Sequence, residues 1–291
     1  MRAPFLILTF ACVFLGASIV IANQVPINFS LLVMALIGAL SAHISVNTLN
    51  EYFDFKSGLD LATKRTAFSG GSGALPNNPE MLTMVFTVAI ASLIATAFIG
   101  CFFIWKYGGA IAPLGIIGLF IIISYTEWIN KHPLLCLIAP VFGFGFLIVV
   151  GSQFVLQGEY VTLSWLVATV PFFLVNNLLL LNQYPDIEAD TNAGRNHFPI
   201  AYGIKHSNMV YGLFTLATTG IIIISVLTGA LPVISLIALI PIPLAVIALY
   251  GAIKHGKNIG HYPQYLATNV AATVLTILLL GMSLLIPTSS M

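Results

Sequence analysis

Long apolar runs alternate with short polar segments along this chain. Nine runs have the length of roughly 17–25 residues that an α-helix needs to cross a bilayer, and the charged residues all lie outside these runs. The pattern predicts an all-α membrane protein with nine transmembrane helices. The predicted spans are residues 4–22, 29–49, 82–104, 108–125, 134–156, 161–182, 208–229, 231–251 and 265–286.

Composition supports the membrane class and excludes others. The 291 residues are 59% hydrophobic and 7% charged, whereas a soluble domain averages about 25% charged residues. The mean hydropathy is +1.03. A net charge of +1 gives no basic surface for nucleic acid. We therefore expect one polytopic domain over residues 1–291, surrounded by membrane lipid and without an obligate protein partner.

The basic residues predict the orientation of the chain. With the N-terminus in the cytoplasm, the inner segments hold nine of the ten Lys and Arg residues, and the outer loops hold Lys106 alone. This excess follows the positive-inside rule. The inner residues are Arg2, Lys56, Lys64, Arg65, Lys131, Arg195, Lys205, Lys254 and Lys257. We expect an integral multi-pass protein of the cell (inner) membrane, with the functional site described next facing the cytoplasm.

Two acidic motifs, at residues 50–60 and 182–190, hold most of the carboxylates. Each follows a predicted even-numbered helix at its cytoplasmic end. Six of the nine Asp and Glu residues lie in them: Glu51, Asp54, Asp60, Asp186, Glu188 and Asp190. An ionisable group at the centre of a membrane helix costs roughly 2.5–3.5 kcal/mol, and less near the interface. Gathering carboxylates at two points therefore indicates a cationic ligand.

Within each motif, polar residues share one helical face, because residues four apart on a helix are neighbours. In the second helix this stripe is His43, Asn47, Asn50 and Asp54. In the sixth it is Asn182, Asp186 and Asp190, with a kink or break expected at Pro185. Polar residues of membrane helices face the bundle interior, so both stripes are expected to line a central apolar cavity. Asp60 joins them only if the chain leaves the helix after Asp54.

Carboxylate and amide oxygens favour magnesium over zinc or copper. Magnesium commonly bridges carboxylates to substrate phosphates, and Lys and Arg residues flank both motifs. The pattern therefore predicts a site for a diphosphate that carries an apolar tail. Other interpretations are helix caps for single Asn and Asp residues, a packing role for His43, interfacial anchoring for Tyr184, and a linker, rather than a lid or a backbone nest, for residues 68–73.

The two motifs together resemble those of the UbiA superfamily of intramembrane prenyltransferases, and the resemblance covers nearly the whole chain. The segment from Asn50 through Asp54 to Asp60 is most similar to the menaquinone-type (1,4-dihydroxy-2-naphthoate prenyltransferase-like) branch. The second motif continues from Asp186 and Asp190 to Gly194-Arg195, as in that branch. The resemblance implies a magnesium-dependent transfer of a prenyl group from a prenyl diphosphate to a small, aromatic quinone precursor.

The resemblance also implies roles for individual residues. Asn50 and Asp54, with Asp60, would hold one magnesium ion, and Asp186 with Asp190 the other. Asn50, Asp54, Asp186 and Asp190 are thus the expected catalytic residues. The expected contacts to the prenyl diphosphate are Lys56, Lys131 and Arg195.

This chain departs from the family pattern at two places. Glu51 replaces the usual Asp, and residues 133–140 lack the acid that menaquinone-type enzymes often carry near the acceptor. Two other enzyme activities therefore stay open: cyclisation of a prenyl diphosphate and prenylation of a non-aromatic lipid. A membrane transporter is the alternative from another class. The clustering of carboxylates at one face counts against it.

Overall fold

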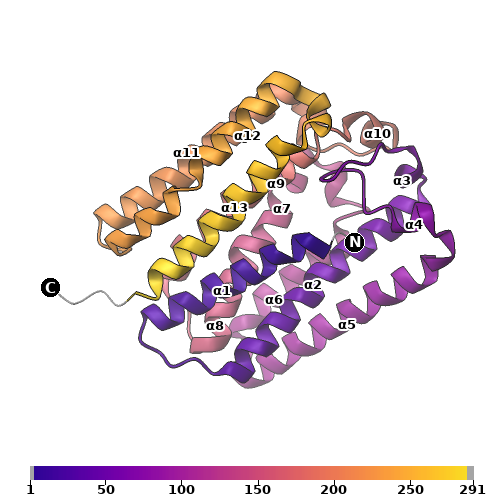
Figure 1. The fold of residues 1–291 in the computed structure, drawn as a ribbon. Helices are drawn as coiled ribbons and strands as arrows, with labels where there is room; N and C mark the ends of the chain where they lie inside the picture. The colour runs from indigo at the N-terminus through magenta and orange to yellow at the C-terminus, as the bar shows by residue number, and fades with distance from the viewer. Residues whose placement is uncertain (1–2, 287–291) are drawn as a thin grey trace.

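The computed structural model describes residues 3–286, and its regular secondary structure within that range is entirely helical (Figure 1). Arg2, counted above with the inner cations, lies outside the described residues. The long helices and the segments that continue them are α1 (Ile7–Ala22), α2 (Phe29–Lys56), α5 (Leu82–Tyr107), α6 (Ala112–Ser124), α7 (Pro133–Phe142), η5 (Gly143–Val150), α8 (Gly151–Gln157), α9 (Thr162–Asn182), α11 (Phe198–Leu227), η6 (Val233–Leu239), α12 (Ile242–His255) and α13 (Pro263–Leu284).

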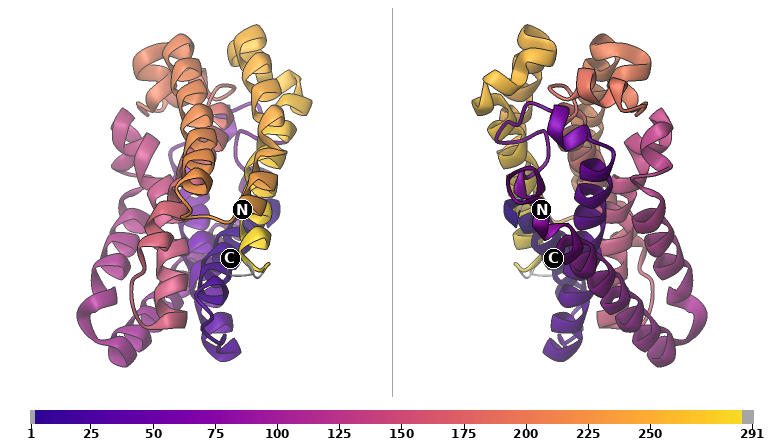
Figure 2. Two further views of the ribbon diagram at one scale, coloured as in Figure 1. Left: turned by 90° about the vertical axis from the view of Figure 1, so that its left-hand side faces the viewer. Right: turned by 90° about the vertical axis from the view of Figure 1, so that its right-hand side faces the viewer.

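Short helices complete the described chain. They are η1 (Ala3–Leu6), α3 (Leu59–Ala62), α4 (Ala74–Asn77), η2 (Pro79–Met81), η3 (Gly108–Ile111), η4 (Ile129–Lys131), α10 (Ile187–Asn192) and η7 (Gly256–His261). Three of them, α3, α4 and α10, lie at the same end of the bundle (Figure 1). The side views also place the segment that contains α3 at the end where α10 lies (Figure 2).

The described residues contain eight segments long and apolar enough to cross a membrane. One of them, Pro79–Ser124, has 46 residues and would be about 69 Å long as a single helix, more than twice the hydrocarbon thickness of about 30 Å. It is divided into α5 and α6 at Gly108, whose φ of +73° and ψ of −164° are not helical. The all-α membrane architecture is confirmed, and the number nine stays a prediction.

Close backbone approach holds the centre of the bundle together. A Cβ atom on Gly145 would lie 2.7 Å from the carbonyl oxygen of Ala168, and one on Gly16 would lie 2.7 Å from that of Val149. Helices in lipid gain little from hydrophobic burial against each other, so small residues and close packing hold them together. These glycines therefore let α1, η5 and α9 pack at short distance.

A buried polar network joins α9, α11 and α13. The Asn177 side-chain amide donates to the Tyr211 carbonyl oxygen at 3.1 Å, and the Tyr211 hydroxyl donates to Asn269 Oδ1 at 2.8 Å. The Asn269 amide in turn donates to the Asn177 carbonyl oxygen at 3.0 Å. All three residues are at most 1% exposed. Each of the three residues donates one of these hydrogen bonds and accepts another, so the network is a closed ring. It fixes the register of the three helices behind the site.

Each acidic motif contains a helix break at the end of the bundle. After α2, Gly58 adopts a φ of +81° and α3 begins at Leu59. After α9, residues 183–186 form a turn that contains Pro185, and α10 begins at Ile187. The expected break at Pro185 is therefore present, and Asn182 and Asp190 lie on different helices.

Candidate active site

The bundle contains a partly open cavity of about 680 Å³ with a polar end and an apolar remainder. Side chains of both acidic motifs line the polar end, and α2, α5, α6, α7, η5 and α8 supply most of the apolar wall. The predicted site residues that line it are Asn50, Asp54, Asp60, Asp186, Asp190 and Arg195. Residues far apart in the sequence thus meet at one end of one cavity.

The first motif presents its polar groups from the last turns of α2 and from α3. The Asn50 amide donates to Asp54 Oδ2 at 2.6 Å, and the Thr126 hydroxyl donates to Asn50 Oδ1 at 3.3 Å. Asp60 reaches the cavity because the chain leaves the helix and turns at Gly58. This turn is the condition under which the sequence predicted that Asp60 joins the site. Asp54 and Asp60 are each 6% exposed, so their carboxylates are largely shielded from water.

Arg195 connects the two motifs. Its guanidinium donates to Asp54 Oδ1 through Nη2 and to Asp190 Oδ1 through Nη1, the latter at 3.1 Å. His197 Nε2 lies 3.0 Å from the other oxygen of Asp190. Burial acts to lower the pKa of Arg195, but the carboxylates of Asp54 and Asp190 outweigh it and hold that pKa above its usual value. The guanidinium is therefore a permanent cation at the polar end.

The glycine-rich segment 68–73 covers the same end with its backbone. The Gly70 N–H donates to Asp186 Oδ2 at 2.8 Å, and the Ser72 N–H donates to Glu51 Oε1 at 3.1 Å. A Cβ atom on Gly71 would lie 2.8 Å from Asp60 Oδ1. The backbone amides of Gly70 and Ser72 thus both donate to carboxylates of the acidic motifs. The segment is thus part of the site, and the linker interpretation is wrong.

Two titratable groups at the polar end are shifted by their surroundings. Burial, together with the charges of Asp54 and Glu51, raises the pKa of Asp60 to about 7. Burial likewise holds the pKa of Tyr125 well above its usual value. A carboxyl group whose charge is disfavoured by neighbouring carboxylates gains most when a cation binds beside it.

No group of three His, Cys, Asp or Glu side chains in residues 3–286 is arranged to hold a metal ion on its own. The five predicted oxygen-donor residues nevertheless line one end of the cavity: Asn50, Asp54, Asp60, Asp186 and Asp190.

Comparison with known proteins bears directly on this arrangement. The model of the UbiA prenyltransferase family matches residues 9–260. The chain belongs to the UbiA prenyltransferase family. It is therefore a prenyltransferase and an integral multi-pass membrane protein, and membership counts against the transporter alternative.

Individual relatives agree with the family match. The chain is 27% identical over 257 residues to the 1,4-dihydroxy-2-naphthoate octaprenyltransferase of Bacillus subtilis (strain 168), covering 85% of this chain and 78% of that protein. The apo structure of a UbiA homolog from Aeropyrum pernix K1 has a TM-score of 0.73 at 16% identity and covers 95% of this chain and 96% of that chain. A UbiA homolog from Archaeoglobus fulgidus bound to DMAPP and Mg2+ has a TM-score of 0.68 at 16% identity, with 96% of each chain covered.

Two predicted diphosphate contacts lie outside the cavity lining of this UbiA family member. The Lys56 ammonium lies over the Tyr52 ring, 5.2 Å from its centroid and 3.4 Å from its hydroxyl oxygen. Lys131 is exposed at the end of η4, and its neighbour Asn130 lines the cavity instead. The structure brings together Arg195 and the five oxygen-donor residues, and it leaves both lysines at the periphery.

The sequence did not single out several residues that the structure places in the site. His197 contacts Asp190, Tyr125 and Asn130 line the cavity, and the Gly70 amide holds Asp186. For the contact between Gly70 and Asp186, the only signal in the sequence was the glycine run at residues 68–73. Tyr184, expected at the membrane interface, is fully buried, and its hydroxyl donates to Asn208 Oδ1 at 2.8 Å.

Proposed function

We propose that this protein is a magnesium-dependent prenyltransferase that moves a prenyl group from a prenyl diphosphate to an aromatic quinone precursor. The observation that carries the proposal is the shared cavity: both acidic motifs and Arg195 line one end, and the rest of the wall is largely apolar. Such a cavity suits a substrate with a charged head and an apolar tail. We further propose one domain over residues 1–291 in the cell (inner) membrane, with the site facing the cytoplasm.

The donor set at the polar end fits magnesium. Asn50, Asp54 and Asp60 would hold one ion, and Asp186 and Asp190 a second. Their carboxylate and amide oxygens are hard ligands. Burial, together with the charges of Asp54 and Glu51, disfavours charge on Asp60, and a bound cation would offset this effect. When bound, magnesium would supply positive charge for the departing diphosphate.

Arg195 supports diphosphate binding with its own charge. Its fork of N–H groups matches phosphate oxygens as well as carboxylates, and it already lies between Asp54 and Asp190. Lys56 and Lys131 are longer-range candidates for the same role, because each carries a flexible side chain at the edge of the polar end. Their contact with diphosphate remains a proposal.

The reaction that this cavity supports forms one carbon–carbon bond and breaks one carbon–oxygen bond. The allylic carbon separates from the diphosphate oxygen, which keeps the bonding electron pair. A ring carbon of the acceptor bonds to the allylic carbon, and that ring carbon then loses its proton to the released diphosphate. Arg195 stabilises the charge on the leaving diphosphate, while the apolar wall excludes water that would otherwise capture the allylic cation.

Sequence similarity supports the class of the acceptor. Similarity to a 1,4-dihydroxy-2-naphthoate octaprenyltransferase at 27% identity supports a quinone-type aromatic ring. The absence of an acid in residues 133–140 removes one group expected beside that acceptor. Cyclisation of the prenyl chain and transfer to a non-aromatic lipid would use the same polar end, and product analysis separates all three.

The test is pyrophosphate release by the purified protein in detergent, with geranylgeranyl diphosphate as donor and mass spectrometry of the lipid products. We expect release that requires both magnesium and an aromatic acceptor and that Asp54→Ala and Asp186→Ala abolish. Glu188→Ala is a matched control, because Glu188 is exposed in the same motif and does not line the cavity. Acceptor-independent release with a cyclised product would instead establish the cyclase, and release without magnesium would contradict the proposal.

A further inference from the structure

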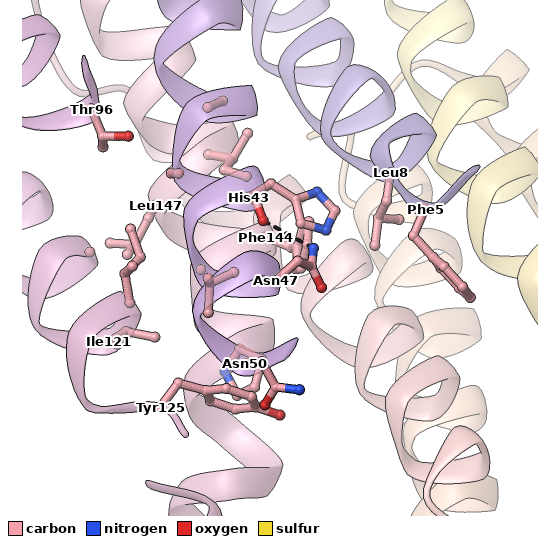
Figure 3. Close-up of a pocket in the computed structure, with 18 of the residues that line it drawn as sticks. Phe5, Leu8, His43, Asn47, Asn50, Thr96, Ile121, Tyr125, Phe144 and Leu147 are labelled. Atoms are coloured by element: carbon pink, nitrogen blue, oxygen red, sulfur yellow. Dashed lines mark hydrogen bonds between the residues drawn. The ribbon is translucent and has the colours of Figure 1, made fainter. Parts of the chain in front are cut away.

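Two polar side chains interrupt the apolar wall of α2. Between Ala35 and Asn50, the α2 residues that line the cavity are apolar except His43 and Asn47. Figure 3 shows both side chains on the same side of α2, which is the side of Phe5 and Leu8. Ionisable groups in membrane helices are rare, face the interior and usually have a function. The proposed diphosphate site uses neither residue.

The imidazole of His43 is held from behind by α1 and η5. Thr9 Oγ1 lies 2.7 Å from His43 Nδ1, and Thr9 is fully buried and outside the cavity lining. The Phe144 ring packs edge-on against the imidazole, with centroids 4.9 Å apart. Because Nδ1 is engaged by Thr9, Nε2 is the ring nitrogen left for a molecule in the cavity. The structure records no partner for Nε2 within residues 3–286.

Asn47 adds an oxygen one turn further along. Its side-chain amide donates to the His43 carbonyl oxygen at 3.0 Å, which fixes the side chain and leaves Oδ1 as its second hydrogen-bonding atom. A ring nitrogen and an amide oxygen therefore lie on one wall. A hydroxyl group both donates and accepts a hydrogen bond, so it can satisfy such a pair.

The charge of the cavity favours a neutral ligand at this wall. Among the described residues that line the cavity, Arg195 is the only Lys or Arg, and it contacts Asp54 and Asp190. A carboxylate beside His43 would have no lysine or arginine to pair with. Burying a charge without a partner is costly, whereas a hydrogen-bonded hydroxyl is not.

We propose that His43 and Asn47 bind the prenyl acceptor, that Thr9 positions His43, and that this subsite selects a neutral hydroxyl-bearing aromatic ring over one with a carboxylate. The inference rests on the proposed prenyl transfer and adds the class of its second substrate. His43 lies seven residues before Asn50, about 10 Å along the helix. A two-ring acceptor held there would lie along the cavity wall of α2 that leads to the proposed diphosphate site.

The test compares two probes that differ only in a carboxylate: 1,4-dihydroxynaphthalene and 1,4-dihydroxy-2-naphthoate. Their affinities are measured anaerobically by equilibrium dialysis against the full-length protein in detergent, with magnesium and the unreactive analogue geranyl S-thiolodiphosphate present. We expect the neutral probe to bind about tenfold more tightly, which corresponds to ~1.4 kcal/mol. His43→Leu should weaken its binding about tenfold, since it removes one hydrogen bond to the probe. Thr9→Val should weaken it about threefold, since it removes only the contact that positions the imidazole.

Three readouts separate acceptor binding from a packing role. Ser45→Ala is the matched control, because Ser45 is fully buried on the same helix, donates to the Ala89 carbonyl oxygen at 3.0 Å and does not line the cavity. It should leave probe affinity unchanged, and His43→Gln should retain more affinity than His43→Leu. Affinity for the diphosphate analogue should be the same in all variants.

Equal probe affinity in His43→Leu and the parent would overturn the inference, as would tighter binding of the carboxylate probe or no binding of either one. Those outcomes leave the proposed function standing if the diphosphate analogue still binds with magnesium. Loss of analogue binding in the parent protein would instead contradict the proposed function itself. A transfer assay then reports the same distinction, because His43→Leu should raise KM for the acceptor and leave KM for the diphosphate unchanged.

Discussion

The bridge from Arg195 to Asp54 and Asp190 makes a quantitative prediction about stability without metal. Arg195→Gln removes the cation and leaves two carboxylates that are 6% and 4% exposed. Breaking a buried ion pair costs about 3–5 kcal/mol. The Arg195 side chain is 18% exposed, so we expect the lower end of that range, ~3 kcal/mol. For a chain of this size that corresponds to a Tm lower by roughly 6–12 °C.

The assay is thermal unfolding in detergent with a chelator, followed by tryptophan fluorescence. Lys205→Gln is the control, since it removes the same charge from an exposed position nearby in the sequence. Saturating magnesium should reduce the deficit of Arg195→Gln, because a divalent ion supplies the missing charge. A Tm equal to that of Lys205→Gln in chelator would refute the ion-pair account, and a deficit that magnesium leaves unchanged would refute the proposed metal site.

Three further predictions follow from single contacts. Gly71→Ala places a Cβ 2.8 Å from Asp60 Oδ1 at a φ of +68°. Magnesium-dependent pyrophosphate release should therefore fall about tenfold, which corresponds to a barrier higher by ~1.4 kcal/mol. The control Gly109→Ala, with open space around the new Cβ, should have no effect. Gly145→Val should destabilise the detergent-solubilised protein by about 1–3 kcal/mol through overpacking against α9; an unfolding temperature matching that of Gly220→Val, which meets nothing within 4 Å, would contradict this. The raised pKa of Asp60, about 7 against 3.8, means that the folded apo protein holds a proton that the unfolded chain has released. Stability in chelator should therefore decrease as pH rises from about 4 to 7, and Asp60→Asn should flatten that slope.

Run length predicted the helices well, and its errors lie at helix ends that carry function. α2 continues from the predicted end at residue 49 to Lys56, because Asn50, Glu51 and Asp54 face the cavity and do not need to leave the helix. α11 begins at Phe198, before the predicted residue 208, and a non-helical Gly203 divides its first turn from the apolar run. The length of an apolar run does not predict polar turns that continue the helix beyond the run.

The candidate site was predicted as a set of residues and not as a set of contacts. Helical spacing alone placed His43, Asn47, Asn50 and Asp54 on one face, and all four line the cavity. The ion pair between Arg195 and Asp54 joins residues 141 positions apart, and no local pattern encodes it. The same holds for the contact from the Gly70 amide to Asp186. Tyr184 was misplaced because the turn at Pro185 directs it into the bundle and away from the interface.

In the proposed function, both acidic motifs hold one prenyl diphosphate through magnesium. The decisive measurement is the magnesium-dependent binding of geranyl S-thiolodiphosphate to the parent protein and to Asp54→Asn and Asp186→Asn, each of which removes one charge from one motif. We expect binding in the parent that a chelator abolishes, and a loss of affinity of at least about tenfold, or ~1.4 kcal/mol, in each variant. Binding that persists in chelator, or that only one of the two substitutions weakens, would contradict it.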